Sequence, residues 1–139
     1  MKIRAFNEND REALRDIFLR SRIAAFHWLD TSAYTLNDFD EATLGEKIWV
    51  AENENVTVGF ISAWLPDNFI HHLFVHPGFV NKGFGKGLLN ACLAHLARPV
   101  TLKCLERNQK AITFYQLQGW EIESKDVDVT GAYFLLKKQ

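Results

Sequence analysis

The 139-residue sequence has few cysteines, almost no net charge and no long apolar run, and each shortage excludes a class of protein. Its two cysteines, Cys92 and Cys104, lack the spacing of a metal or redox pair, which favours a reducing compartment, the cytoplasm. The formal net charge of −1 argues against nucleic acid or a membrane surface as a general partner. No apolar stretch is long enough to cross a membrane, and the first residues lack the apolar core of a signal peptide.

What the sequence does contain suits one folded unit. Apolar residues make up 47% of the chain and charged residues 24%, a balance typical of ordered globular proteins. The sequence shows no linker, repeat or low-complexity segment. We therefore expect a single domain over residues 1–139.

The hydrophobic pattern predicts strands interleaved with helices. Asn7 with Asp10, and Thr35 with Asp38, have the spacing of helix N-terminal caps. The expected strands are residues 2–6, 47–53, 56–65, 69–76, 100–105, 120–123 and 132–137. The expected helices are residues 7–25, 35–45, 88–96 and 108–119.

The most informative segment follows the strand at residues 69–76. Glycines alternate with other residues in the run Lys82-Gly83-Phe84-Gly85-Lys86-Gly87. Glycine has no side chain, so several backbone N–H groups could approach one anion there, and the following helix adds the positive end of its dipole. Lys82 and Lys86 add positive charge. The segment therefore predicts a phosphate-binding loop.

Two common phosphate-binding motifs do not match this loop. A P-loop requires Lys-Ser or Lys-Thr after its second glycine, whereas Gly87 follows Lys86 here. A Rossmann fingerprint requires a third glycine at the position of Leu88, in a larger doubly wound domain than this chain can form. Both readings fail.

Two motifs together resemble the acetyl-CoA-binding region of the GCN5-related N-acetyltransferase (GNAT) superfamily. The first is the strand and loop Leu73-Phe74-Val75-His76-Pro77 and Val80-Asn81-Lys82-Gly83-Phe84-Gly85. The second, similar to the family's Asn-x-x-Ala-x-x-Phe-Tyr-x-x-x-Gly-Phe, is Asn108-Gln109-Lys110-Ala111-Ile112-Thr113-Phe114-Tyr115-Gln116-Leu117-Gln118-Gly119-Trp120. The resemblance covers about residues 69–120 and indicates a small, single-domain member of bacterial type. One position departs, because Val80 stands where the family has Gln or Arg.

The resemblance implies a fold and an activity. The fold would be α/β, with a mixed, mostly antiparallel twisted sheet of about six to seven strands, flanking helices and a splay between the two central strands. Acetyl-CoA would be the co-substrate, without a metal. The acetyl group would pass directly, in a ternary complex, to a primary amine of a small molecule or a protein. A non-catalytic acyl-CoA-binding module of the same fold is the alternative, and both a monomer and a homodimer are compatible with the sequence.

The resemblance also assigns roles to residues. Tyr115 would protonate the departing thiolate, a backbone N–H near Leu73 would polarise the thioester carbonyl, and His71 would be the base, a role that suits histidine near neutral pH. The expected cofactor-binding residues are Leu73, Phe74, Val75, Asn81, Lys82, Gly83, Phe84, Gly85, Lys86, Gly87 and Asn108. The candidates for the acceptor site are His27, Trp28 and Phe69.

Several of these residues have a purely structural alternative. Tyr115 could pack its helix against the sheet, and His71 could line the acceptor site without titrating, since many family members use water in place of a base. Asn108 has the place of a helix cap. Strand alternation puts His71 and His72 on opposite sides of their strand, which argues against a shared metal ion.

Overall fold

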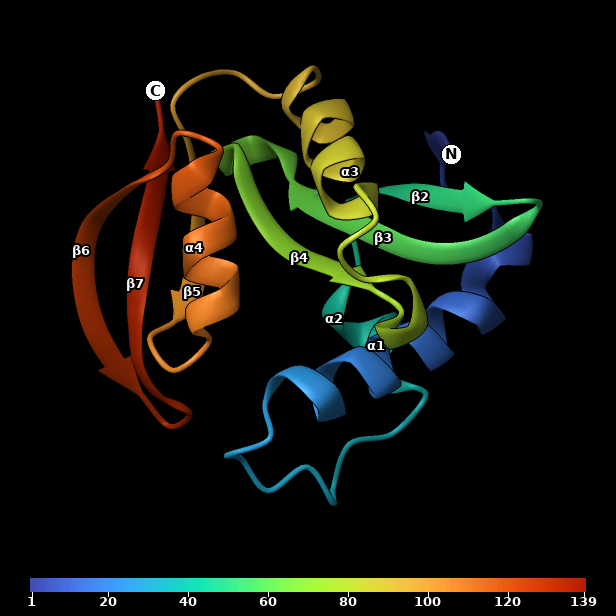
Figure 1. The fold of residues 1–139 in the computed structure, drawn as a ribbon, viewed down its shortest axis with the longest axis horizontal. Coiled ribbons are helices and arrows are strands. Elements are labelled where there is room, and N and C mark those ends of the chain that lie inside the picture. Colours follow the sequence, from blue (N-terminus) through green and yellow to red (C-terminus); the bar gives the residue numbers. More distant parts are fainter.

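The computed structural model describes residues 1–139 as one sheet with helices on both of its faces (Figure 1). The strands are β1 (Lys2–Ala5), β2 (Lys47–Asn53), β3 (Val56–Trp64), β4 (Phe69–Val75), β5 (Val100–Leu105), β6 (Glu121–Asp128) and β7 (Gly131–Lys138). The helices are α1 (Arg11–Ala25), α2 (Asp38–Ala42), α3 (Phe84–Leu93) and α4 (Gln109–Leu117). None of the helices combines the length and the apolarity needed to span a bilayer.

The seven strands lie in the order β1-β2-β3-β4-β5-β7-β6. Neighbouring strands are antiparallel except β4 and β5, which are parallel. The mixed, mostly antiparallel α/β fold is therefore confirmed.

Alternation along β2 divides the apolar core into two layers. Ile48 and Val50 belong to a cluster of seven buried residues that includes α1 and α2. Trp49 and Ala51 belong to a cluster of 19 buried residues that includes α3 and α4. The sheet is thus covered on both faces, and its central strands are held from both sides.

The two central strands part shortly after they meet. β4 and β5 pair only at Phe69 with Thr101 and at Ile70 with Leu102. Beyond Ile70, β4 runs away from β5, and Figure 1 shows α4 lying beside the gap. The expected splay is confirmed, and it opens the edge of β4 that carries the first motif.

Of the two predicted helix caps, the one at Asn7 is confirmed and the one at Thr35 is wrong. The Asn7 side chain accepts the N–H of Asn9, and Asp10 accepts the N–H of Asn7 at 2.8 Å, as expected for a cap. Thr35 is not a cap, because the carboxylate of Asp38 accepts both its N–H and its hydroxyl, each at 2.9 Å. The short helix α2 therefore starts only at Asp38.

Helix α3 begins at Phe84, earlier than the expected start at residue 88. Glycines are poor helix formers, so the run Gly83–Gly87 reads as a loop from its propensities alone. In the fold, Gly83 has a φ of +88° and ends the loop, while the side chain of Phe84 is buried in the core. Tertiary packing thus overrides the low propensity and draws Gly85 to Gly87 into the helix.

Candidate active site

The segment from Val80 to the start of α3 presents a row of free backbone donors. No N–H group from Val80 through Lys86 has a hydrogen-bond acceptor within the chain. Asn81 (φ +63°) and Gly83 (φ +88°) adopt the left-handed conformation that turns successive N–H groups to one side. The helix dipole of α3 adds positive potential at the same place. This concave row of donors fits the diphosphate of a nucleotide.

Gly87 differs from the other glycines of the loop. Its N–H already donates to the carbonyl of Gly83 at 3.1 Å, so it is not available to a ligand. A Cβ added at Gly87 would lie 2.9 Å from Sδ of Met1, whereas one added at Gly85 would lie 3.7 Å from the Phe114 ring. Gly87 therefore lets α3 pack closely against the N-terminal segment, and it is unsuited to the cofactor contact expected from the sequence.

The two lysines of the loop have no acidic partner within the chain. Neither Lys82 nor Lys86 forms an ion pair, and the Lys82 ammonium lies 5.8 Å from the centroid of the Phe79 ring. Val80 is 48% exposed beside the loop, where no polar side chain takes its place. The loop thus offers main-chain donors and two lysines to an anion.

Two cavities meet at the splay. The loop cavity, of about 260 Å³, lies between the loop, β4 and α4. The strand cavity, of about 330 Å³, lies between β4 and β5 and reaches α1. The residues that line both cavities are Leu73, Ala111 and Tyr115. A molecule that enters from the loop and one that enters between the strands would therefore meet at Leu73 and Tyr115.

The backbone of β4 offers donors to this meeting point. The N–H of His76 donates to Val58 on β3, so alternation turns the N–H of Phe74 toward β3 as well. The N–H groups of Leu73 and Val75 then face the opened side. Leu73 and Val75 can pair with an extended ligand, as expected, whereas the ring of Phe74 packs 5.6 Å from that of Phe18 in the core.

Tyr115 lies on α4, with only 8% of its surface exposed. Burial, and then the neighbouring Cys104 and Cys92, raise the pKa of its phenol well above the ordinary value of about 10. Its ring meets that of Trp120 edge-on at 5.6 Å, which fixes the ring between α4 and the sheet. The hydroxyl consequently stays protonated at every physiological pH and is able to donate a hydrogen bond.

Asn108 occupies the N-cap position of α4, but its side chain makes no cap hydrogen bond. The expectation of a side-chain cap is therefore wrong. The residue lines the strand cavity, and its amide has no partner within the chain. That amide is free to bind the polar groups of a ligand.

A β-bulge at His71 overturns the expected alternation of the two histidines. Ser62 pairs with His72 and the next residue, Ala63, pairs with Ile70, which leaves His71 without a cross-strand partner. The extra residue brings the two imidazole rings together, stacked with centroids 3.8 Å apart and planes 29° apart. His71 and His72 therefore do not lie on opposite sides.

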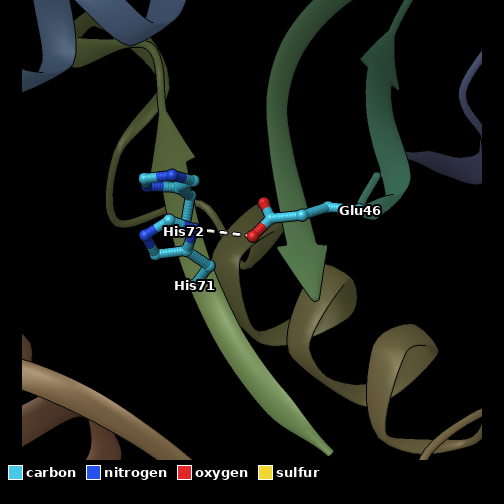
Figure 2. A group of neighbouring side chains, drawn as sticks. All are labelled: Glu46, His71 and His72. Carbon is cyan, nitrogen blue, oxygen red and sulfur yellow. Dashed lines mark hydrogen bonds and ion pairs between the residues drawn. The ribbon is translucent and has the colours of Figure 1, made fainter. Parts of the chain in front are cut away.

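His71 pairs with a carboxylate that the sequence did not point to (Figure 2). Its Nδ1 lies 2.6 Å from Oε2 of Glu46, a residue just before β2 whose side chain is only 7% exposed. Burial raises the pKa of Glu46, but the hydrogen bond from His71, the neighbouring hydroxyl of Ser62 and the two histidines outweigh it, and the pKa stays below its ordinary value. Glu46 is thus ionised.

Only long-range register brings Glu46 to this place. Lys47 lies opposite Ala63 on β3, and Ala63 lies opposite Ile70 on β4. No local motif surrounds Glu46. Its contact with His71 could have been predicted only from the correct register of three strands and the position of the bulge.

His72 differs in character from His71. Its partly buried ring packs edge-on against Phe18 at 5.0 Å, and its Nε2 lies 3.4 Å from the carbonyl of Ala42. Burial, and then the proximity of His71, lower the pKa of His72 to about 4. His72 is therefore a neutral ring that stacks on His71.

The same three side chains raise the question of a metal ion. Glu46, His71 and His72 each offer a ligand atom, and these atoms lie within 4.8 Å of one another, so the alternation argument against a shared ion is wrong. The in-plane lone pairs of two nearly parallel, stacked rings do not converge on a point about 2 Å from both nitrogens, as zinc requires. The geometry describes a hydrogen-bonded group more closely than a metal site.

Of the three residues expected at the acceptor site, only Phe69 lines the strand cavity. Phe69 lines the cavity, as do Arg22 and Phe26 at the end of α1. His27 and Trp28 do not line it, and the Arg107 guanidinium lies 5.5 Å from the Trp28 ring instead. The turn after α1 bends so that Phe26, rather than the next two residues, faces the cavity.

A family model described as the acetyltransferase (GNAT) family matches residues 11–120. The peptidyl-lysine N-acetyltransferase YjaB of Escherichia coli (strain K12) is 30% identical over 135 residues, which cover 94% of this chain and 90% of YjaB. The peptidyl-lysine N-acetyltransferase YiaC of the same organism is 29% identical over 126 residues, which cover 86% of this chain and 83% of YiaC.

A solved structure shows the same fold. The PaiA N-acetyltransferase of Thermoplasma acidophilum, in complex with coenzyme A, superposes with a TM-score of 0.82 over 99% of this chain and 98% of that chain. Its sequence identity of 19% makes this a likeness of fold alone.

Proposed function

Because the chain belongs to the acetyltransferase (GNAT) family, we propose that it moves an acetyl group from acetyl-CoA to the ε-amino group of lysine in proteins. One observation carries the proposal: the loop cavity and the strand cavity meet at Leu73 and Tyr115, where two substrates would come into contact. Two Escherichia coli relatives that bear the name peptidyl-lysine N-acetyltransferase support the choice of lysine. Phe69 and other apolar side chains line a strand cavity of about 330 Å³, which suits the alkyl chain of lysine.

The residues of the splay would bind the co-substrate along its length. Acetyl-CoA supplies an acyl group activated as a thioester. The free N–H groups from Val80 to Lys86 would bind the diphosphate, and the Asn108 amide and the Val75 N–H would hold the pantetheine arm. The Leu73 N–H would donate to the thioester oxygen and stabilise the charge that develops there.

Proton transfer would fall to His71 and Tyr115. An alkyl ammonium has a pKa of about 10.4, so a proton must leave the acceptor nitrogen before or during attack. His71 would accept that proton from the strand cavity. The Tyr115 hydroxyl would donate a hydrogen bond to the sulfur as the carbon–sulfur bond breaks, which stabilises the departing thiolate.

The cysteines support direct transfer rather than an acyl-enzyme. Burial raises the pKa of Cys104 to about 11 and that of Cys92 to about 12, so both remain thiols and poor nucleophiles. Neither would carry the acetyl group, and both substrates would have to bind together. Two unpaired thiols also fit our proposal of a cytoplasmic location.

The test is coenzyme A release with matched acceptors. A lysine peptide with a blocked N-terminus, the same peptide with the lysine acetylated, a peptide with only a free α-amine, and a small diamine would be compared. We expect turnover with the first only, and mass spectrometry should place the acetyl group on the lysine. Turnover restricted to the diamine or the α-amine would overturn the choice of acceptor. Tight acetyl-CoA binding without turnover on any amine would favour a sensing module.

A further inference from the structure

We propose that Glu46 is the positioning residue that holds His71 with Nδ1–H toward the carboxylate and Nε2 toward the acceptor amine. The inference rests on the proposed function, since it concerns how the candidate base is oriented. Figure 2 shows one nitrogen of the His71 ring directed at Glu46 and the other on the far side of the ring.

The charge state of Glu46 fixes which nitrogen carries the proton. An ionised carboxylate can only accept a hydrogen bond, so the 2.6 Å contact requires Nδ1 to be the donor. A neutral His71 then has its lone pair on Nε2. Since His71 lines the strand cavity, that lone pair is the one available to an amine bound there.

The bulge explains why His71 needs such a partner. A residue in a regular ladder is oriented by its cross-strand neighbours, but His71 has none. Its side chain is 44% exposed, so packing alone does not fix the ring. The stack on His72 sets the plane of the ring, and the bond to Glu46 sets its rotation.

The burial of Glu46 favours a role beyond stability. Its Oε1 is buried and has no hydrogen-bond partner. A partly unpaired, buried carboxylate destabilises a fold, and replacement by an apolar residue is often neutral or better. When His71 accepts a proton, however, the carboxylate becomes half of an ion pair, and the arrangement stabilises the charge that the reaction creates.

Several ionisable groups contact His71 or line the strand cavity with it, and Glu46 is the one carboxylate among them. The charge of Arg22 is paired with Asp38 at 3.1 Å, and Lys103 is paired with Asp128. Glu46 and His72 contact the ring, and the other ionisable groups that line the strand cavity with His71 are Arg22 on α1, Lys103 and Cys104 on β5 and Tyr115 on α4.

Two substitutions at Glu46 separate its charge from its hydrogen bond. Glu46→Gln keeps an acceptor but removes the charge, so kcat should fall about 10-fold or more while the KM for acetyl-CoA changes little. The pH profile of kcat should change as well, because a neutral amide cannot form an ion pair with a protonated ring. Glu46→Leu removes the acceptor, and nitrogen NMR of the histidines should show His71 losing its Nδ1–H form.

Glu52→Gln is the matched control. Like Glu46, Glu52 accepts a hydrogen bond from a basic side chain, but the donor is Nε of Arg4, at 2.9 Å, and not His71. Its substitution should leave the rate profile and the His71 tautomer unchanged. Thermal unfolding of all three variants would identify any that fail to fold, and Glu46→Asp, which keeps the charge, should recover part of the rate.

An unchanged pH profile in Glu46→Gln, or a retained Nδ1–H form in Glu46→Leu, would overturn the proposal. The NMR measurement needs no turnover. A protein that acetylates no amine would therefore sink the proposed function while the spectrum still reports whether Glu46 orients His71.

Discussion

The rings of His71 and His72, consecutive residues on β4, stack with their centroids 3.8 Å apart. In a regular strand these side chains would point to opposite faces. The bulge opposite Ser62 and Ala63 places them on one side, where His71 reaches Glu46 and His72 remains among aromatic rings. One inserted residue thus allows the candidate base, His71, to stack on His72 and to bond to Glu46.

Removal of the Tyr115 hydroxyl should impair chemistry more than binding. We expect Tyr115→Phe to lower kcat about 10²-fold, because the departing sulfur loses its donor, and to leave the acetyl-CoA dissociation constant nearly unchanged. Steady-state rates and calorimetry would measure the two effects. Tyr133→Phe, on β7 outside both cavities, is the control. A full rate in Tyr115→Phe would remove Tyr115 from the reaction.

A methyl group at Gly85 should have opposite effects on stability and on binding. Gly85 lies in the first turn of α3, and a Cβ there would make an ordinary 3.7 Å contact with Phe114. Gly85→Ala should raise the unfolding free energy of the unliganded protein by about 0.5–1 kcal/mol. Because the methyl enters the loop cavity, coenzyme A affinity should fall about 10-fold, or about 1.4 kcal/mol.

Asn90→Ala is the control for that experiment. Asn90 is exposed on the same helix and lies away from the loop cavity, so its substitution should add helix propensity alone. If Gly85→Ala bound coenzyme A as tightly as the parent protein, the diphosphate would not approach the start of α3 as closely as we infer.

Stability should depend on pH through His72. The folded-state pKa of His72 is about 4, against an ordinary value of 6.5, so the unfolded chain binds a proton that the folded one excludes between these limits. Stability therefore falls as the pH drops from about 6.5 to 4, by up to about 3 kcal/mol. Denaturant unfolding at several pH values would measure this slope.

His72→Phe should flatten that dependence. Phenylalanine suits a site already bordered by Phe18, Phe60 and Phe74, and it carries no titrating group. Residual slope would come from the acidic groups, among them Glu46, whose lowered pKa acts in the same direction. A slope equal to that of the parent protein would show that His72 is not the group responsible.

Removal of divalent metals should leave activity intact. The stacked rings of His71 and His72 do not aim their lone pairs at one point, so we expect no loss of rate after dialysis against a chelator. A loss that zinc restores, and that disappears in His72→Phe, would instead make Glu46, His71 and His72 a metal site.

Local motifs predicted what lies close along the chain. The glycine-rich segment at residues 82–87, the place of Tyr115 on a helix and the edges of most strands followed from spacing and periodicity. The sequence failed where a long-range contact decides the outcome. The partnership of Glu46 with His71 depends on the registers of three strands, and the start of α3 depends on the burial of Phe84.

Side-chain capping also proved hard to anticipate. Asn108 and Thr35 have residue types that favour caps, yet neither side chain caps its helix. A cap motif states which hydrogen bond a residue is able to make, whereas competing partners in the fold decide whether it forms. At Thr35 the carboxylate of Asp38 accepts the hydrogen bond of the hydroxyl group. At Asn108 the side-chain amide makes no cap hydrogen bond and can bind a ligand.

The short pairing between β4 and β5 has a mechanical consequence. Only Phe69 and Ile70 of β4 pair with β5, so few main-chain hydrogen bonds join the strands β1 to β4 to the strands β5 to β7. An extended ligand with amide groups, bound in that opening, would form main-chain hydrogen bonds as an additional strand and so connect the two parts of the sheet. Ligand binding should then make the protein more rigid. The rate of amide hydrogen exchange along the free edge of β4 should fall as the fraction of protein with bound ligand increases.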